Sequence, residues 1–71
     1  MIKAELIAYL SKLPDDEPVF LLRAQDVTAP DVMVDWVLGA ERAGCTNQQK
    51  LADALQLSVK MREWPNRKVP D

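Results

Sequence analysis

Histidine is absent from this chain of 71 residues, and cysteine occurs only once, at position 45. The usual zinc sites are built from several histidine and cysteine side chains, so none of that kind is expected. A nucleophile activated by a histidine base and a disulfide within the chain are excluded for the same reason. The carboxylates of Asp26, Asp31 and Asp35 offer too few converging oxygens for a hard cation. We therefore expect no catalytic residue, no metal and no cofactor.

Long apolar runs are also missing. No window approaches 18 consecutive apolar residues, which excludes a membrane-spanning helix. Glu5 stands where a signal peptide would have its basic and apolar regions, and an unpaired Cys45 suits a reducing compartment. The sequence therefore predicts a cytoplasmic protein that does not contact a membrane.

Three stretches carry apolar residues at the spacing of a helix surface, and they predict helices over residues 2–12, 29–43 and 47–64. Pro14 and Pro65 end the first and the third, because the residue before a proline is disfavoured in a helical conformation. Gly44 is expected to end the second. The predicted fold class is all-α, with one domain over residues 1–65 and a loosely ordered polar tail over 66–71.

The helix starts and the packing are also predicted. Thr28 and Thr46 have the position and chemistry of N-caps. The second and third predicted helices are separated by a short turn, so they should form a hairpin. The first helix should cover the apolar side of that hairpin, and both Trp36 and Trp64 should belong to the core.

Residues 19–22 form an apolar run between turn signals and predict a short extended or strand segment. Three arrangements would satisfy its backbone: pairing with the tail near residues 68–69, pairing with a second copy, or packing at one end of the helices. The sequence leaves these three alternatives open.

The second predicted helix is apolar nearly all round from residue 32 to 38, because Val34 and Leu38 lie off its main stripe. Such a helix is usually buried on two sides, and three helices provide cover for only one. A domain this small also gains stability by associating. We therefore predict a non-enzymatic protein-interaction module, a homo-oligomer with a dimer favoured, whose interface contains Phe20, Leu21, Val34 and Leu38.

A nucleic-acid-binding regulator using residues 48–68 is the alternative. The segment QQKLADALQLS, residues 48–58, resembles the first helix and turn of phage-repressor helix-turn-helix motifs. Gln56 replaces the glycine expected in the turn, and Arg62 and Pro65 replace apolar anchors. Residues 36–71 carry a net charge of +2, against −4 for residues 1–35. The residues that would contact nucleic acid are Lys60, Arg62, Trp64, Arg67 and Lys68.

A second resemblance concerns PVFLLRAQD, residues 18–26, followed by Ala29-Pro30 and a helix that carries a tryptophan. This pattern resembles a segment of small uncharacterised proteins from bacteriophages and related mobile elements. The resemblance implies an accessory protein that binds a host or phage protein, and it assigns no activity and no functional residues.

Overall fold

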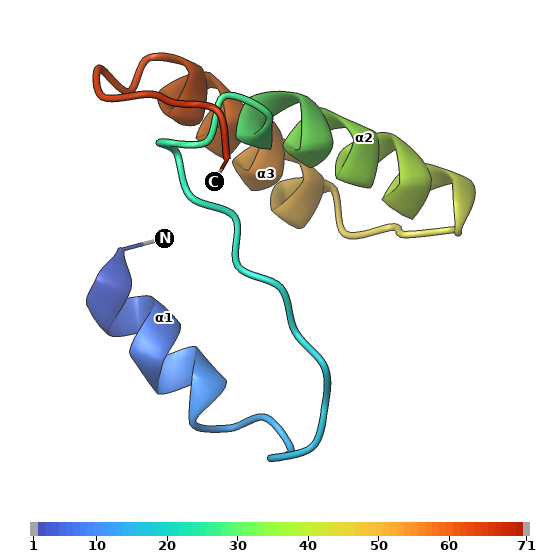
Figure 1. The fold of residues 1–71 in the computed structure, drawn as a ribbon. Helices are drawn as coiled ribbons and strands as arrows, with labels where there is room; N and C mark the ends of the chain where they lie inside the picture. The colour runs from blue at the N-terminus through green and yellow to red at the C-terminus, as the bar shows by residue number, and fades with distance from the viewer. Residues whose placement is uncertain (1, 71) are drawn as a thin grey trace.

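A computed structural model of the chain describes residues 2–70, and Met1 and Asp71 lie outside the described part. Within it lie three helices, α1 (Lys3–Leu10), α2 (Ala29–Arg42) and α3 (Gln48–Arg62), and no strand (Figure 1). The predicted all-α class with three helices is confirmed. Each helix is one to three residues shorter than the sequence predicts, for reasons that lie in its ends.

The C-terminal ends of α1 and α3 tighten before their prolines. The backbone N–H groups of residues 12, 13 and 64 donate to the carbonyl oxygen three residues back, at 3.0, 3.1 and 3.2 Å, instead of four back. The hydroxyl of Ser11 donates to the carbonyl of Ala8 at 2.7 Å, which also competes with regular helix geometry. These residues therefore form turns that the apolar spacing alone cannot distinguish from helix.

Gly44 ends α2 as predicted. Its φ of +96° lies in the left-handed region that favours glycine. The N–H of Gly44 donates to the carbonyl of Glu41 at 3.0 Å, and the N–H of Cys45 donates to that of Ala40 at 2.9 Å. This pair of bonds is a Schellman motif, which satisfies carbonyl groups that the helix end would otherwise leave unpaired.

Thr28 occupies the N-cap position of α2, as predicted, whereas Thr46 does not cap α3. Thr28 precedes α2 but has helical φ and ψ angles, and its side chain makes no capping hydrogen bond. A capping residue needs an extended backbone to aim its oxygen at the first turn. At α3 the cap is Asn47, one residue after Thr46, and its side-chain oxygen accepts from the backbone N–H of Lys50 at 3.1 Å.

Helices α2 and α3 form an antiparallel helical pair that contains the core. The beginning of α2 lies beside the end of α3, where the side chains of Asp31 and Arg62 meet at 3.0 Å. The side chains fully buried between the helices include Val37, Leu51 and Ala54, with Met33, Ala40 and Cys45 partly buried against them. Further along the pair, Ala29, Pro30, Ser58 and Met61 are also buried.

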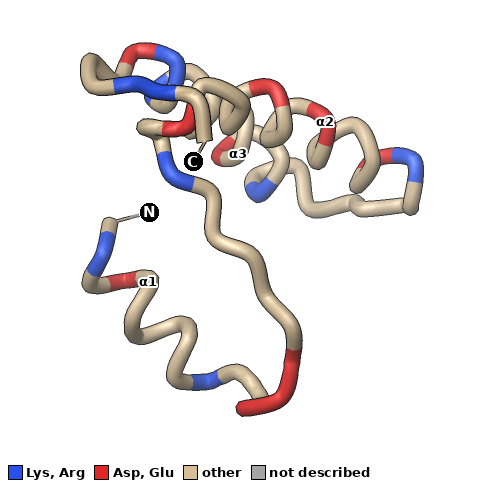
Figure 2. The backbone as a smooth tube through the Cα atoms, in the orientation of Figure 1, with Lys and Arg blue, Asp and Glu red and all other residues tan. Residues whose placement is uncertain are grey.

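Helix α1, which belongs to the N-terminal arm (residues 2–24), is not packed on this core, which corrects the expectation that the first helix covers the hairpin. Among the described residues, no Cα atom of α1 comes within 8 Å of one in α2 or α3, and no residue of α1 is buried. The segment over residues 19–22 is extended, as predicted, but it closes no end of the pair, since Phe20 is 86% exposed. Figures 1 and 2 show it as an uncharged span that runs from the turn after α1 back to the helical pair.

The tail is better fixed than the sequence predicts. Lys68 forms a parallel bridge with Asp26, in which its N–H donates to Gln25 at 2.7 Å and its carbonyl accepts from Val27 at 2.9 Å. The tail thus pairs beside the start of α2 and not with residues 19–22.

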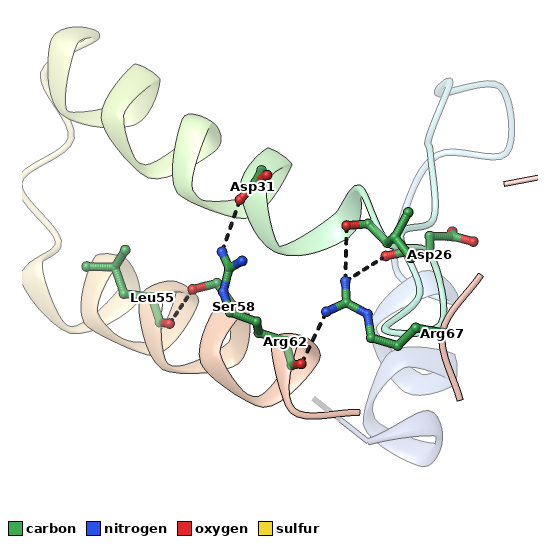
Figure 3. A network of polar contacts seen from close by, with 7 residues as sticks. Asp26, Asp31, Leu55, Ser58, Arg62 and Arg67 are labelled. Atoms are coloured by element: carbon green, nitrogen blue, oxygen red, sulfur yellow. Dashed lines mark hydrogen bonds and ion pairs between the residues drawn. The ribbon is translucent and has the colours of Figure 1, made fainter. Parts of the chain in front are cut away.

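Arg67 reinforces this pairing, as Figure 3 shows. Its guanidinium donates to the carbonyl of Arg62 at 3.1 Å, and to those of Asp26 and Val27 at 3.3 and 3.1 Å. One side chain therefore connects the end of α3 to the turn that precedes α2.

Candidate interaction surfaces

A groove with a volume of about 640 Å³ runs along one side of the helical pair. Five apolar side chains form its floor: Val32, Met33 and Trp36 from α2, and Ala54 and Leu57 from α3. Polar and charged side chains of α3 border it: Lys50, Asp53, Gln56 and Lys60. The N-terminal arm contributes only Glu5 of α1 and Leu22 to the lining.

Trp36 shows how the groove forms. The sequence predicts a core tryptophan, but 45% of this residue is exposed, because α1 does not cover this side of α2. The ammonium group of Lys50 lies 5.9 Å from the centre of its ring, within the range of a cation–π contact. Trp36 therefore lines the groove and stays partly exposed.

The opposite side of the pair carries a second apolar surface. Leu38 lies two turns after Asp31 on the same side of α2, and Leu55 lies two turns before Arg62 on the same side of α3. Since the helices are antiparallel and Asp31 pairs with Arg62, both steps lead toward the same end of the pair. Val34 and Val59 fall one turn from the ion pair in the same way. The flank surface thus comprises Val34, Leu38, Leu55 and Val59.

The groove and the flank surface face different directions. Trp36 and Leu38 are two residues apart in α2, which is roughly 200° around a helix. Leu55 and Leu57 are related in the same way in α3. The helical pair therefore offers one apolar surface on each side of its core.

The four residues predicted to form the interface are divided between elements. Val34 and Leu38 share the flank surface, with Val34 half-buried and Leu38 47% exposed. Phe20 and Leu21 are exposed on the extended segment, whose next residue, Leu22, lines the groove. The groove was not predicted from the sequence. The available signal was that Val32 and Leu57, which line it, broaden the apolar stripes of their helices.

The residues predicted for nucleic-acid binding are largely engaged within the chain. Arg62 pairs with Asp31, Arg67 donates to three backbone carbonyls, and the backbone of Lys68 forms the bridge to residues 25–27. Lys60 borders the groove, and Trp64 is 51% exposed and not in the core. Of the two guanidinium groups that would bind phosphates, that of Arg67 fastens the tail and that of Arg62 lies in an exposed ion pair between α2 and α3.

The helix-turn-helix geometry is not formed. Residues 48–62 are one continuous helix, so the segment around Gln56 and Ser58 is not a turn. Ser58 is buried, and its hydroxyl donates a hydrogen bond to the backbone carbonyl of Leu55 in the preceding turn of the same helix, at 2.6 Å. From residue 63 to 70 the described chain has no further helix that could enter a DNA groove.

Residues 2–70 form neither a metal-binding cluster nor a membrane-spanning helix. No three or more Cys, Asp or Glu side chains are grouped there in a way that could hold a metal ion. None of the helices in that part of the chain combines the length and apolar character that a bilayer crossing requires.

Comparison with protein-family models, with curated proteins and with solved structures gave no significant match for this chain. The resemblance of residues 18–26 to phage proteins therefore stays a prediction. The interaction surfaces must be interpreted from their own chemistry.

Proposed function

We propose that this chain is a non-enzymatic protein-interaction module that associates with a second copy of itself. The observation that carries the proposal is the flank surface, where Leu38, Leu55 and Val59 are 47, 42 and 53% exposed beside one another on the helical pair. Contiguous apolar surface on a small domain marks a binding site more often than it remains in water. The exposed Phe20 and Leu21 add to the apolar area that association would remove from solvent.

The size of the core supports the same proposal. Burial between two helices supplies most of the stability, and a domain of this length gains much of what it lacks by oligomerising. The proposal includes a cytoplasmic location, because Cys45 is a free thiol. It also includes a host or phage protein as a further partner, supported by the sequence resemblance of residues 18–26.

Multi-angle light scattering from low to high micromolar concentration tests self-association. We expect a dimer at high concentration, and we expect Leu38→Asp to convert it to a monomer, since a buried carboxylate without a partner opposes association strongly. Val69→Asp is the matched control, because Val69 is exposed in the tail, away from the flank surface. Circular dichroism of both variants verifies that the helices persist. A wild-type chain that is monomeric at high micromolar concentration overturns the proposal.

A further inference from the structure

We propose that the groove of the helical pair receives helix α1 of a second copy, so that two chains exchange their N-terminal arms. This inference rests on the proposed contact between flank surfaces and adds a second contact between the two copies, through the groove on the other side of each helical pair. Each groove then receives the apolar face of the partner copy's α1, whereas the chain's own α1 contributes only Glu5 to the lining.

Helix α1 has an apolar face that does not pack against α2 or α3. Its face is formed by apolar residues at helical spacing, and none of them is buried: Ile2, Leu6, Tyr9, Leu10 and Leu13. A helix of eight residues is too short to persist in water on its own propensity. Its stability must therefore come from a surface that covers this face.

The groove is the matching receptor. Its floor is apolar, and Lys50 and Lys60 border it. On α1, Glu5 lies beside Ile2 and Tyr9 at the edge of the apolar face. A helix that enters the groove with its apolar face inward brings this carboxylate to a border with two lysines. An amphipathic helix in an apolar groove is a recurrent mode of protein recognition.

The connection between α1 and α2 favours the groove of a second copy over that of the same chain. Pro14 and Pro18 bias the residues before them toward extended conformations. A turn closed by the N–H of Glu17 and the carbonyl of Pro14, at 3.3 Å, precedes the extended residues 18–22, and this connection leaves α1 unpacked against the helical pair of its own chain. Of α1 itself, only Glu5 reaches the chain's own groove.

The reach of the arm fits the size of the molecule. Seven extended residues, 17–23, span roughly 23 Å, which exceeds the shortest principal extent of the molecule, 20 Å. An arm of that length places α1 over a neighbouring pair. Reciprocal exchange about a two-fold axis then fills both grooves and leaves no open end.

Disulfide trapping tests the exchange in the full chain. All variants carry Cys45→Ala, so that only introduced cysteines react. Chains with Leu10→Cys are mixed with chains with Leu57→Cys and mildly oxidised. We expect this pair to form a covalent heterodimer at least roughly ten-fold faster than Leu10→Cys with Val59→Cys, since docking raises the effective concentration only on the groove side.

A chain that carries both Leu10→Cys and Leu57→Cys separates exchange from closure within one chain. Diluted into an excess of cysteine-free chains, it should form little internal disulfide if α1 binds the partner's groove. An internal disulfide that persists under dilution overturns the exchange. A second readout is light scattering of Leu10→Asp, which should weaken the dimer at least roughly ten-fold, while Ala8→Asp on the opposite side of α1 leaves it unchanged.

The outcomes also separate this inference from the proposed function. A dimer that persists in light scattering but forms no Leu10–Leu57 disulfide overturns the exchange and leaves self-association intact, with the flank surface as the interface. A chain that stays monomeric at every concentration overturns both.

Discussion

The helical pair and the N-terminal arm contain apolar residues in similar patterns, but only the pair buries them. In α2 and α3, Val37, Leu51 and Ala54 close on one another, whereas every residue of α1 stays partly or fully in solvent. Both regions carry apolar residues at helical spacing, but only the helical pair buries them.

The connections explain part of the difference. Five residues separate α2 from α3, and eighteen separate α1 from α2. The entropy of closing the longer loop exceeds that of the shorter by only roughly 1 kcal/mol. This difference in free energy is too small to explain why α2 and α3 pack together while α1 does not. The conformation of each connection decides: Gly44 reverses the chain directly into the next helix, whereas the turn at residues 14–17 is followed by an extended segment over 18–23.

The largest expected contrast comes from matched leucine truncations. Leu51→Ala should cost about 2–5 kcal/mol of the free energy of unfolding, because it removes buried contacts between α2 and α3. Leu10→Ala in α1 should cost about 0.5 kcal/mol or less in the dilute monomer, since that side chain is 43% exposed. Urea unfolding followed by circular dichroism measures both. Equal losses would show that α1 is packed as firmly as the core.

Arg67 tests what fastens the tail to the helical pair. Arg67→Ala removes charged donors from three backbone carbonyls, and we expect a loss of about 1.5–3 kcal/mol. Arg67→Lys should recover only part of it, because an ammonium group cannot reproduce the spread of the guanidinium donors. Hydrogen exchange at Val27 and Lys68 should accelerate in the alanine variant. Unchanged exchange there would mean that the bridge holds without Arg67.

The two glycines test the conformational explanation of the short connection. Gly44→Ala should cost about 1–2 kcal/mol, because alanine is strained at a φ of +96° although no atom lies within 4 Å of the added methyl group. Gly39→Ala, inside α2, should instead stabilise by about 0.5–1 kcal/mol, since its Cβ meets only the Arg42 side chain at 3.8 Å. Thermal unfolding of both variants should shift in opposite directions, and shifts of the same sign contradict the explanation.

The smallest effect is expected at the ion pair between α2 and α3. The side chains of Arg62 and Asp31 are 58 and 79% exposed, so water screens their attraction and the coupling energy should be about 0–1 kcal/mol. A double-mutant cycle with Arg62→Gln and Asp31→Asn isolates this energy from the favourable position of Asp31 in the first turn of α2. The coupling should shrink in high salt. A coupling energy above this range would mean that the ion pair contributes more to the contact between α2 and α3 than its exposure predicts.

Much of the helical pair was predictable from local signals. Apolar spacing located α2 and α3, Pro65 limited α3, and Gly44 ended α2 at the expected position. The N-cap of α3 was not predictable in this way. Threonine is no better an N-cap than asparagine, so the choice between Thr46 and the adjacent Asn47 depends on their backbone angles.

The interaction surfaces were predictable only in part. Val34 and Leu38 stand off the main stripe of their helix, and that spacing alone indicated a second apolar side. The groove required knowing that α1 does not cover Trp36, which no local pattern records. The role of Arg67 was hidden for a similar reason, because its partners lie forty and forty-one residues away in the chain.

The sequence by itself determined the fold class, the approximate helices and the end of α2, since each follows from helical periodicity, proline geometry or the freedom of glycine. The tertiary structure decided which apolar faces meet, how the tail is fastened and where a groove remains open. Those outcomes depend on contacts between residues far apart in the chain, where the local preferences of several surfaces compete for the same partner and only packing selects one.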